Sequence, residues 1–184
     1  MSIADLVQLL ASRSAKRGEF TLSSGHSSTL YIDARLTTMS PEGLTIIGSL
    51  GLYALREANW NVDAVGGLTL GADPIAYAIA YASAGSTKPI RAFTVRKEVK
   101  SHGMGRLIEG PFHSGDYVAV IEDVITTGSS AMKAAHAIRD AGGNIAGVLA
   151  IVDREQGGRE TLETEGFSVI ALTRASDIIA QMES

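Results

Sequence analysis

The sequence predicts one α/β domain built on a mostly parallel β-sheet. Two observations favour this fold class. Short, nearly continuous apolar runs recur along the chain, and segments with the residue pattern of helices alternate with them. Strands that are buried on both faces give such apolar runs, and helices then cover the two faces of the sheet. The length of 184 residues fits a single domain over residues 1–184, without an internal repeat or a linker.

The N-terminal part precedes this alternation. Apolar residues at helical spacing predict an amphipathic helix over residues 2–17, and Gly18 is expected to end it. Two short strands are expected at 19–22 and 29–36, separated by a turn rich in serine and glycine. These strands are expected to form a small cap over the main domain.

From residue 40 onward, helix and strand signals alternate. Ser40 and Pro41 predict a helix that runs to about residue 58, because a serine hydroxyl caps a helix and proline suits its first position. Further strands are expected at 62–65, 90–95, 117–121, 145–152 and 167–172, and further helices from Asp73 and over 129–141, 158–165 and 176–182.

The composition excludes several classes of function. Hydrophobic residues make up 45% of the chain and charged residues 20%, which is a globular balance. The net charge of −4 argues against the broad basic surface of a nucleic-acid-binding protein. The chain has no cysteine, so disulfides, zinc–thiolate sites and thiol nucleophiles are excluded. It shows neither a signal peptide nor an apolar run that could span a bilayer, so we expect a cytoplasmic protein without membrane or nucleic-acid partners.

The sharpest motif spans residues 118–130, where a predicted strand leads through two acidic residues into a loop of small residues and then a helix. Gly128 permits a tight turn. The exposed amides at the start of the helix, with the positive end of the helix dipole, form an anion site suited to a phosphate. Ligands of open parallel sheets bind at the carboxyl ends of the strands, where this loop is expected. The motif is not a Walker A loop, because no Gly-Lys-Ser/Thr follows.

The two acidic residues, Glu122 and Asp123, distinguish this motif from a simple phosphate loop. Two carboxylates would repel a phosphate unless they bind another part of the ligand. Ribose hydroxyls and a Mg²⁺ ion bound to the ligand are suitable partners. The alternative without a ligand is a strand that ends in polar residues before a helix capped by threonine or serine.

A second motif is the basic, glycine-containing loop over residues 96–110. A loop of this length inside a compact domain is usually functional or disordered. Its basic side chains would surround an anion, and its glycines could act as the hinges of a lid. Closure would stabilise negative charge on a leaving group and keep water away. The alternative is a solvated surface loop.

The acidic pair and the loop after it resemble the PRPP motif of the type I phosphoribosyltransferases, which use phosphoribosyl pyrophosphate (PRPP) as donor. The resemblance implies that class's fold, a central, mostly parallel sheet flanked by helices, with residues 1–36 contributing a small hood. It also implies that the acidic pair holds the ribose hydroxyls and that the loop holds the 5′-phosphate. The PRPP-binding residues expected from this motif are Glu122, Asp123, Val124, Ile125, Thr126, Thr127, Gly128, Ser129 and Ser130.

The loop sequence Arg96-Lys97-Glu98-x-Lys100-x-His102-Gly103 resembles the mobile catalytic loop of the orotate phosphoribosyltransferase family. The resemblance implies that ribose 5-phosphate passes from PRPP to orotate, giving orotidine 5′-monophosphate and pyrophosphate in pyrimidine (UMP) biosynthesis. It implies that Lys100, His102 and Asp123 are catalytic, and that Arg96 and Lys97 also bind PRPP. In that family Arg96, Lys100 and His102 correspond to residues that act in the partner's site. A homodimer with shared active sites is therefore expected.

Two further segments extend the resemblance. Residues 66–72 resemble the family's loop that approaches pyrophosphate through backbone amides, and Arg154 matches an arginine that helps to hold orotate, with Thr126 beside it. The implied cofactor is Mg²⁺, held mainly through PRPP and water and not by direct protein ligands. Two alternatives stay open: a phosphoribosyltransferase for another base, such as a purine or uracil, and a PRPP-sensing regulator without catalysis.

Overall fold

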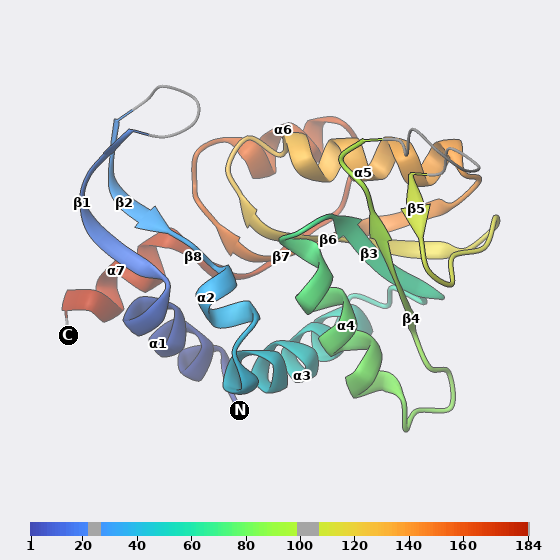
Figure 1. The fold of residues 1–184 in the computed structure, drawn as a ribbon, viewed down its shortest axis with the longest axis horizontal. Helices are drawn as coiled ribbons and strands as arrows, with labels where there is room; N and C mark the ends of the chain where they lie inside the picture. Colours follow the sequence, from blue (N-terminus) through green and yellow to red (C-terminus); the bar gives the residue numbers. More distant parts are fainter. Residues whose placement is uncertain (22–26, 99–106, 184) are drawn as a thin grey trace.

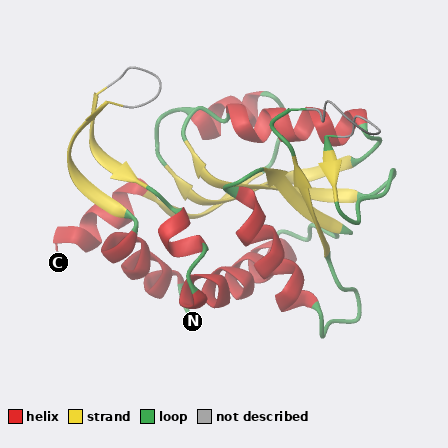
Figure 2. Ribbon diagram, viewed as in Figure 1, coloured by secondary structure: helices red, strands yellow, loops and turns green. Residues whose placement is uncertain are grey.

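The main body is a six-stranded sheet with the strand order β5-β4-β3-β6-β7-β8 (Figures 1 and 2). The computed structural model describes residues 1–21, 27–98 and 107–183. Neighbouring strands pair in parallel, except that the edge strand β5 runs antiparallel to β4. The predicted mostly parallel α/β sheet is therefore confirmed. The strands are β3 (Ala64–Leu68), β4 (Arg91–Val95), β5 (Ile108–Glu109), β6 (Tyr117–Ile125), β7 (Asn144–Asp153) and β8 (Val169–Arg174).

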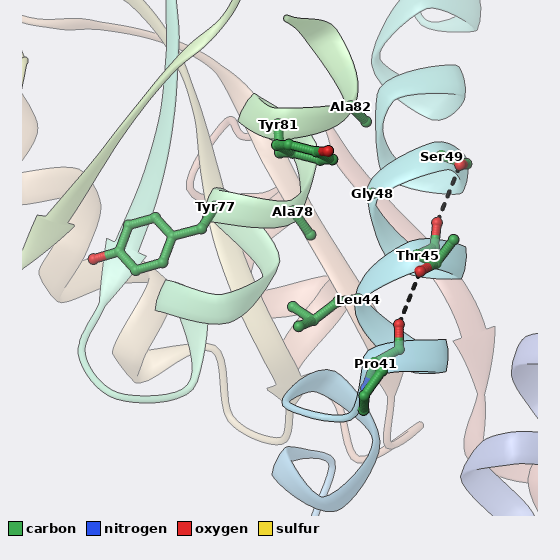
Figure 3. A pocket seen from close by; sticks show the side chains of 9 residues that line it. All are labelled: Pro41, Leu44, Thr45, Gly48, Ser49, Tyr77, Ala78, Tyr81 and Ala82. Atoms are coloured by element: carbon green, nitrogen blue, oxygen red, sulfur yellow. Dashed lines mark hydrogen bonds between the residues drawn. The ribbon is translucent and has the colours of Figure 1, made fainter.

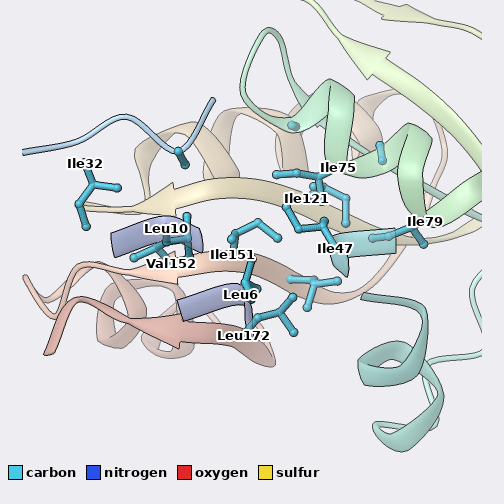
Figure 4. Packing of buried hydrophobic residues seen from close by; sticks show 14 of the residues in the cluster. Leu6, Leu10, Ile32, Ile47, Ile75, Ile79, Ile121, Ile151, Val152 and Leu172 are labelled. Carbon is cyan, nitrogen blue, oxygen red and sulfur yellow. The ribbon is translucent and has the colours of Figure 1, made fainter. Parts of the chain in front are cut away.

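Helices cover both faces of the sheet (Figure 1). One face packs against α1 (Ile3–Arg13), α3 (Pro41–Glu57), α4 (Ala72–Ser83) and α7 (Ala175–Glu183), and the other against α5 (Ser129–Asp140) and α6 (Gly158–Thr164). Successive strand side chains point to opposite faces, so β6 contributes to two separate cores. Ile121 packs with Leu6, Ile47 and Ile75 (Figure 4), whereas Val120 belongs to the core under α5. The sheet is thus held rigidly between its helices, and the strand ends that leave it are fixed in position.

The N-terminal hairpin forms a second, separate sheet. Strands β1 (Ala15–Thr21) and β2 (Ser27–Ile32) pair antiparallel and extend from the body beyond the carboxyl end of β7 (Figure 1). The rings of Phe20 and Tyr31 lie with their centroids 5.4 Å apart across this pair. The hairpin has the position expected of the predicted cap.

Two predicted boundaries in this region are wrong. Helix α1 ends at Arg13, and Gly18 lies inside β1 instead of ending the helix. The helix stops earlier because Ser14 closes its last turn and the Ser14 hydroxyl is bound to the Thr37 hydroxyl, 2.7 Å away in the core. The second strand stops at Ile32, because the chain turns at residue 33 into the short helix α2 (Arg35–Thr38).

Strand β6 is longer than predicted. It continues through Glu122 and Asp123 to Ile125, because β7 pairs with it along this whole length, with Ile125 opposite Asp153. The acidic pair therefore lies within a hydrogen-bonded strand and not after its end. This pairing gives the two carboxylates a fixed backbone, which a loop would not provide.

Candidate active site

A pocket of about 340 Å³ lies at the carboxyl ends of β3, β6 and β7, as expected for an open parallel sheet. The hood and α2 close one side of it, and the residue after β4 reaches it from another. Its lining residues are Tyr31, Ile32, Asp33, Ala34, Arg35, Leu68, Thr69, Leu70, Gly71, Lys97, Glu122, Asp123, Val124, Thr126, Ser130 and Arg154. Segments that are distant in sequence thus meet at one site.

Glu122 and Asp123 have different environments although they are neighbours. Glu122 is 8% exposed, and this burial raises the pKa of its carboxyl to about 9, with the adjacent Asp123 carboxylate as a second cause. Asp123 is partly exposed and accepts a 2.8 Å hydrogen bond from the backbone N–H of Val124. At neutral pH Glu122 is therefore protonated and able to donate a hydrogen bond. The pair can offer a ligand both a donor and an acceptor.

The loop before α5 has the geometry of a phosphate cradle. Gly128 adopts a left-handed conformation with φ of 80°, which glycine adopts without strain. The helix begins directly after it, so the first amides of α5 point toward the pocket mouth, where Thr126 and Ser130 line the wall. The Ile125 side chain is fully buried in the core, so only its backbone can meet a ligand. Thr127, Gly128 and Ser129 complete the turn but do not line the pocket.

The basic loop is described only in part. Lys97 lines the pocket, and Arg96 does not; its guanidinium lies 3.6 Å from the Glu109 carboxylate on β5. Lys100 and His102, which were predicted to be catalytic, lie outside the described residues. The structure thus brings Lys97 to the acidic pair and places Arg96 at the start of the same loop.

Arg154 enters the pocket from the end of β7 and is buried, with 7% of its surface exposed. Removal from water lowers the pKa of its guanidinium, which still remains charged at neutral pH. The next residue, Glu155, has a positive φ of 57°, and its carboxylate accepts hydrogen bonds from the backbone N–H and hydroxyl of Ser176 at the start of α7. These contacts fix the turn that carries Arg154.

The turn after β3 forms the opposite wall. A Cβ atom at Gly71 would lie 2.5 Å from the Asp123 carboxyl, so a glycine is needed for this close approach. Sequence reasoning did not single out Arg35 of α2, which lines the pocket and binds Asp33 with a 2.8 Å ion pair. No local signal could have found Arg35, because its place in the pocket depends on how the hood folds back.

The acidic pair suits a hard cation that arrives with a phosphorylated ligand. Over the described ranges, no three histidine or carboxylate side chains gather as a metal-binding cluster. Of the two acids, the partly exposed Asp123 has the oxygen atoms suited to contact such a cation or its water. Within the same ranges, no helix has the length and apolar character needed to cross a bilayer.

The parallel sheet with its hood, the acidic pair and the phosphate cradle define a type I phosphoribosyltransferase. The same fold occurs in the adenine phosphoribosyltransferase of Leishmania tarentolae, with a TM-score of 0.65 at 15% identity, over 96% of this chain and 90% of that one. The chain is 50% identical over 177 residues to the orotate phosphoribosyltransferase of Aquifex aeolicus, a match that covers 95% of this chain and 96% of the relative. It therefore belongs to the orotate phosphoribosyltransferase family.

Other relatives agree. The orotate phosphoribosyltransferase of Synechocystis is 47% identical over 94% of this chain and 86% of its own length. The structure of the Mycobacterium tuberculosis H37Rv enzyme in complex with PRPP matches with a TM-score of 0.77 at 36% identity, over 96% of this chain and 90% of that one. A scan against protein-family models gives no match.

Proposed function

We propose that this chain transfers the ribose 5-phosphate group of PRPP to orotate and releases pyrophosphate, forming orotidine 5′-monophosphate for pyrimidine synthesis. The observation that carries this proposal is the meeting of the acidic pair, the phosphate cradle and Arg154 in one pocket. Family membership gives the reaction, and the pocket supplies groups for each part of the two substrates.

The PRPP end of the site follows from its chemistry. The 5′-phosphate binds the amides and hydroxyls of residues 126–130, because the helix start there favours an anion. The ribose hydroxyls bind Glu122 and Asp123, and the backbone of Val124 and Ile125 supports the same sugar. The M. tuberculosis relative has been solved in complex with PRPP, which supports this donor for the present chain.

Orotate is assigned to the other end of the pocket. Its carboxylate and ring oxygens suit the guanidinium of Arg154, which forms paired, charge-assisted hydrogen bonds. Thr126 lines the wall between this position and the phosphate cradle. A purine or uracil has no carboxylate for such an arginine, so the site favours orotate over the bases of the alternative hypothesis.

The transfer breaks the bond between ribose C1 and a pyrophosphate oxygen and forms a bond between C1 and a ring nitrogen of orotate. Orotate loses its ring N–H proton, and the released pyrophosphate can accept it. Positive side chains stabilise the charge that develops on pyrophosphate. We assign this role to Arg96, Lys97, Lys100 and His102, with Lys100, His102 and Asp123 as the catalytic groups. Closure of the loop over residues 96–110 would exclude water.

Mg²⁺ is the proposed cofactor, bound mainly through PRPP and water. When bound, it neutralises negative charge on the pyrophosphate. The contribution of the chain itself is Asp123, whose carboxylate faces the pocket and can hold a water of the ion. We expect the reaction to take place in the cytoplasm, and fractionation of cells would test that compartment.

We further propose a homodimer in which Arg96, Lys100 and His102 act in the partner's active site. The surface between α3 and α4 supports an interface, because it forms an apolar groove where Tyr77 and Tyr81 are 52% and 85% exposed (Figure 3). Exposed aromatic side chains are enriched in protein interfaces. Light scattering of the purified protein, with and without the change Tyr81→Glu, would test this surface.

The experiment that tests the reaction follows orotate absorbance after PRPP and Mg²⁺ are added to the purified protein. Uracil and purine bases serve as parallel acceptors. Loss of absorbance that requires PRPP, with no nucleotide formed from the other bases, supports the proposal. Nucleotide formed only from another base would show that the acceptor is wrong, and no reaction with any base would favour the PRPP-sensing regulator.

A further inference from the structure

Asp73 is a buried carboxylate that the proposed chemistry does not use. It lies in the first turn of α4, it is 8% exposed, and it does not line the pocket. In the described part of the chain, no lysine or arginine forms an ion pair with it. A buried charge without an ionic partner is costly, so its hydrogen bonds are of particular interest.

Both carboxylate oxygens of Asp73 accept hydrogen bonds from threonine hydroxyls of two different elements. Thr69, in the turn after β3, donates to one oxygen at 2.6 Å, and Thr94 of β4 donates to the other at 2.8 Å. The Tyr77 hydroxyl lies 2.8 Å from the Thr94 hydroxyl. Because Thr94 gives its only proton to Asp73, Tyr77 must be the donor of this third hydrogen bond.

This network joins two segments of the pocket. Thr69 belongs to the turn over residues 69–71, which lines the pocket and approaches the Asp123 carboxyl through Gly71. The backbone N–H of Thr69 also donates to the carbonyl of Val95 at 2.8 Å. Thr94 is followed, three residues later, by Lys97, which lines the pocket from the start of the basic loop.

We propose that Asp73 is a positioning residue for PRPP, because it holds the 69–71 turn at a fixed place beside the end of β4. This inference rests on the proposed function, in which the turn and Lys97 face the pyrophosphate group. Asp73 acts through Thr69 and Thr94 and does not touch the ligand. Its two hydroxyl partners also separate its negative charge from the pocket, where a bare carboxylate would repel pyrophosphate.

The test compares the changes Asp73→Ala, Asp73→Asn and Thr69→Val in the full-length protein. Titration calorimetry measures PRPP binding without orotate, and steady-state rates give KM for each substrate. Asp73→Ala and Thr69→Val are expected to weaken PRPP binding by about tenfold, from the loss of a hydrogen bond to a charged group. KM for orotate should change much less. Asp73→Asn should retain most of the affinity for PRPP, because an amide can bond to both threonine hydroxyls.

The matched control is Asp116→Asn or Asp116→Ala. Asp116 is equally buried, at 7% exposure, but it lies at the amino end of β6 and binds Arg91 and the backbone of His113. Its changes should lower the melting temperature without a selective effect on PRPP.

Each outcome decides. Equal weakening of PRPP and orotate binding, or a loss of stability alone, would overturn the positioning role. Tighter PRPP binding after both Asp73→Asn and Asp73→Ala would also overturn it, because simple charge repulsion would then explain the residue. If the wild-type protein does not bind PRPP, the proposed function itself fails. If it binds PRPP and Asp73→Ala binds it equally well, only the role of Asp73 is refuted.

Discussion

Arg154 donates a 3.1 Å hydrogen bond from its guanidinium to the backbone carbonyl of Leu30, 124 residues earlier in the chain. The side chain proposed to hold orotate is therefore also attached to strand β2 of the hood. Orotate binding and the position of the hood share one buried cation. A change at Arg154 should affect both.

The change Arg154→Lys keeps the charge but removes the planar group with several N–H donors. We expect KM for orotate to rise by about tenfold or more and KM for PRPP to change little, because paired hydrogen bonds to a carboxylate are lost. Hydrogen exchange of the β2 amides should also become faster. Steady-state kinetics and exchange measured by mass spectrometry check the two effects.

The control for this change is Arg159→Lys. Arg159 lies on α6 and pairs with Glu163 and the carbonyl of Val169, away from the pocket. It should leave both KM values unchanged. Equal increases of KM for the two substrates in Arg154→Lys would contradict the assignment of this residue to orotate.

Glu122 should make the stability depend on pH. The folded-state pKa of about 9 lies above the reference value of 4.5, so unfolding releases a proton between these values. The free energy of unfolding should therefore fall as pH rises through this window, by up to about 1.4 kcal/mol per pH unit. Glu122→Gln should remove this contribution, so that its stability relative to the wild type increases with pH.

Urea unfolding at about pH 5, 7 and 9 measures this effect as a difference between variant and wild type. Glu160→Gln, at an exposed position on α6, is the control and should leave the pH dependence unchanged. A constant difference between Glu122→Gln and the wild type over the whole range would show that Glu122 ionises normally.

Gly128→Ala should damage the phosphate cradle. The left-handed backbone would cost about 1–2 kcal/mol with alanine. The new Cβ would also lie 3.0 Å from the carbonyl oxygen of Gly158 and from Leu162. We expect lower stability and a raised KM for PRPP, which thermal unfolding and kinetics would measure.

Gly166→Ala provides a matched comparison for the cradle. Gly166 has a similar φ of +85°, but no atom lies within 4 Å of its added Cβ, and it precedes the amino end of β8. This variant should lose stability without a change in KM for PRPP. If both variants raised KM alike, the effect of Gly128 would be one of global stability.

Shared active sites predict complementation between two inactive variants. Lys100→Ala and Asp123→Asn should each have little activity, but mixed dimers would contain one site with both native residues. Random mixing in equal amounts should restore about a quarter of the wild-type activity, since half of the dimers are mixed and each has one intact site. Assays after subunit exchange measure this. Absence of any recovery, with mixed dimers demonstrated by mass spectrometry, would contradict sites shared between subunits.

The sequence by itself determined the fold class and the phosphate motif. Apolar runs and helical periodicity depend on residues close together in the chain, and so does the glycine turn at Gly128 between the acidic pair and α5. The Ser40 cap of α3 was predicted for the same reason, and its hydroxyl accepts the expected hydrogen bond from Gly43. The resemblance of residues 96–103 to a known catalytic loop also came from sequence alone.

Only the tertiary structure decided how these residues differ in environment. Glu122 and Asp123 are adjacent and similar in sequence, but the packing of the sheet buries one and leaves the other at the pocket. The contact of Arg154 with Leu30 and the bonds of Asp73 to Thr69 and Thr94 join different elements. Burial and long-range hydrogen bonds depend on how distant segments pack, and no local pattern of residues carries that information.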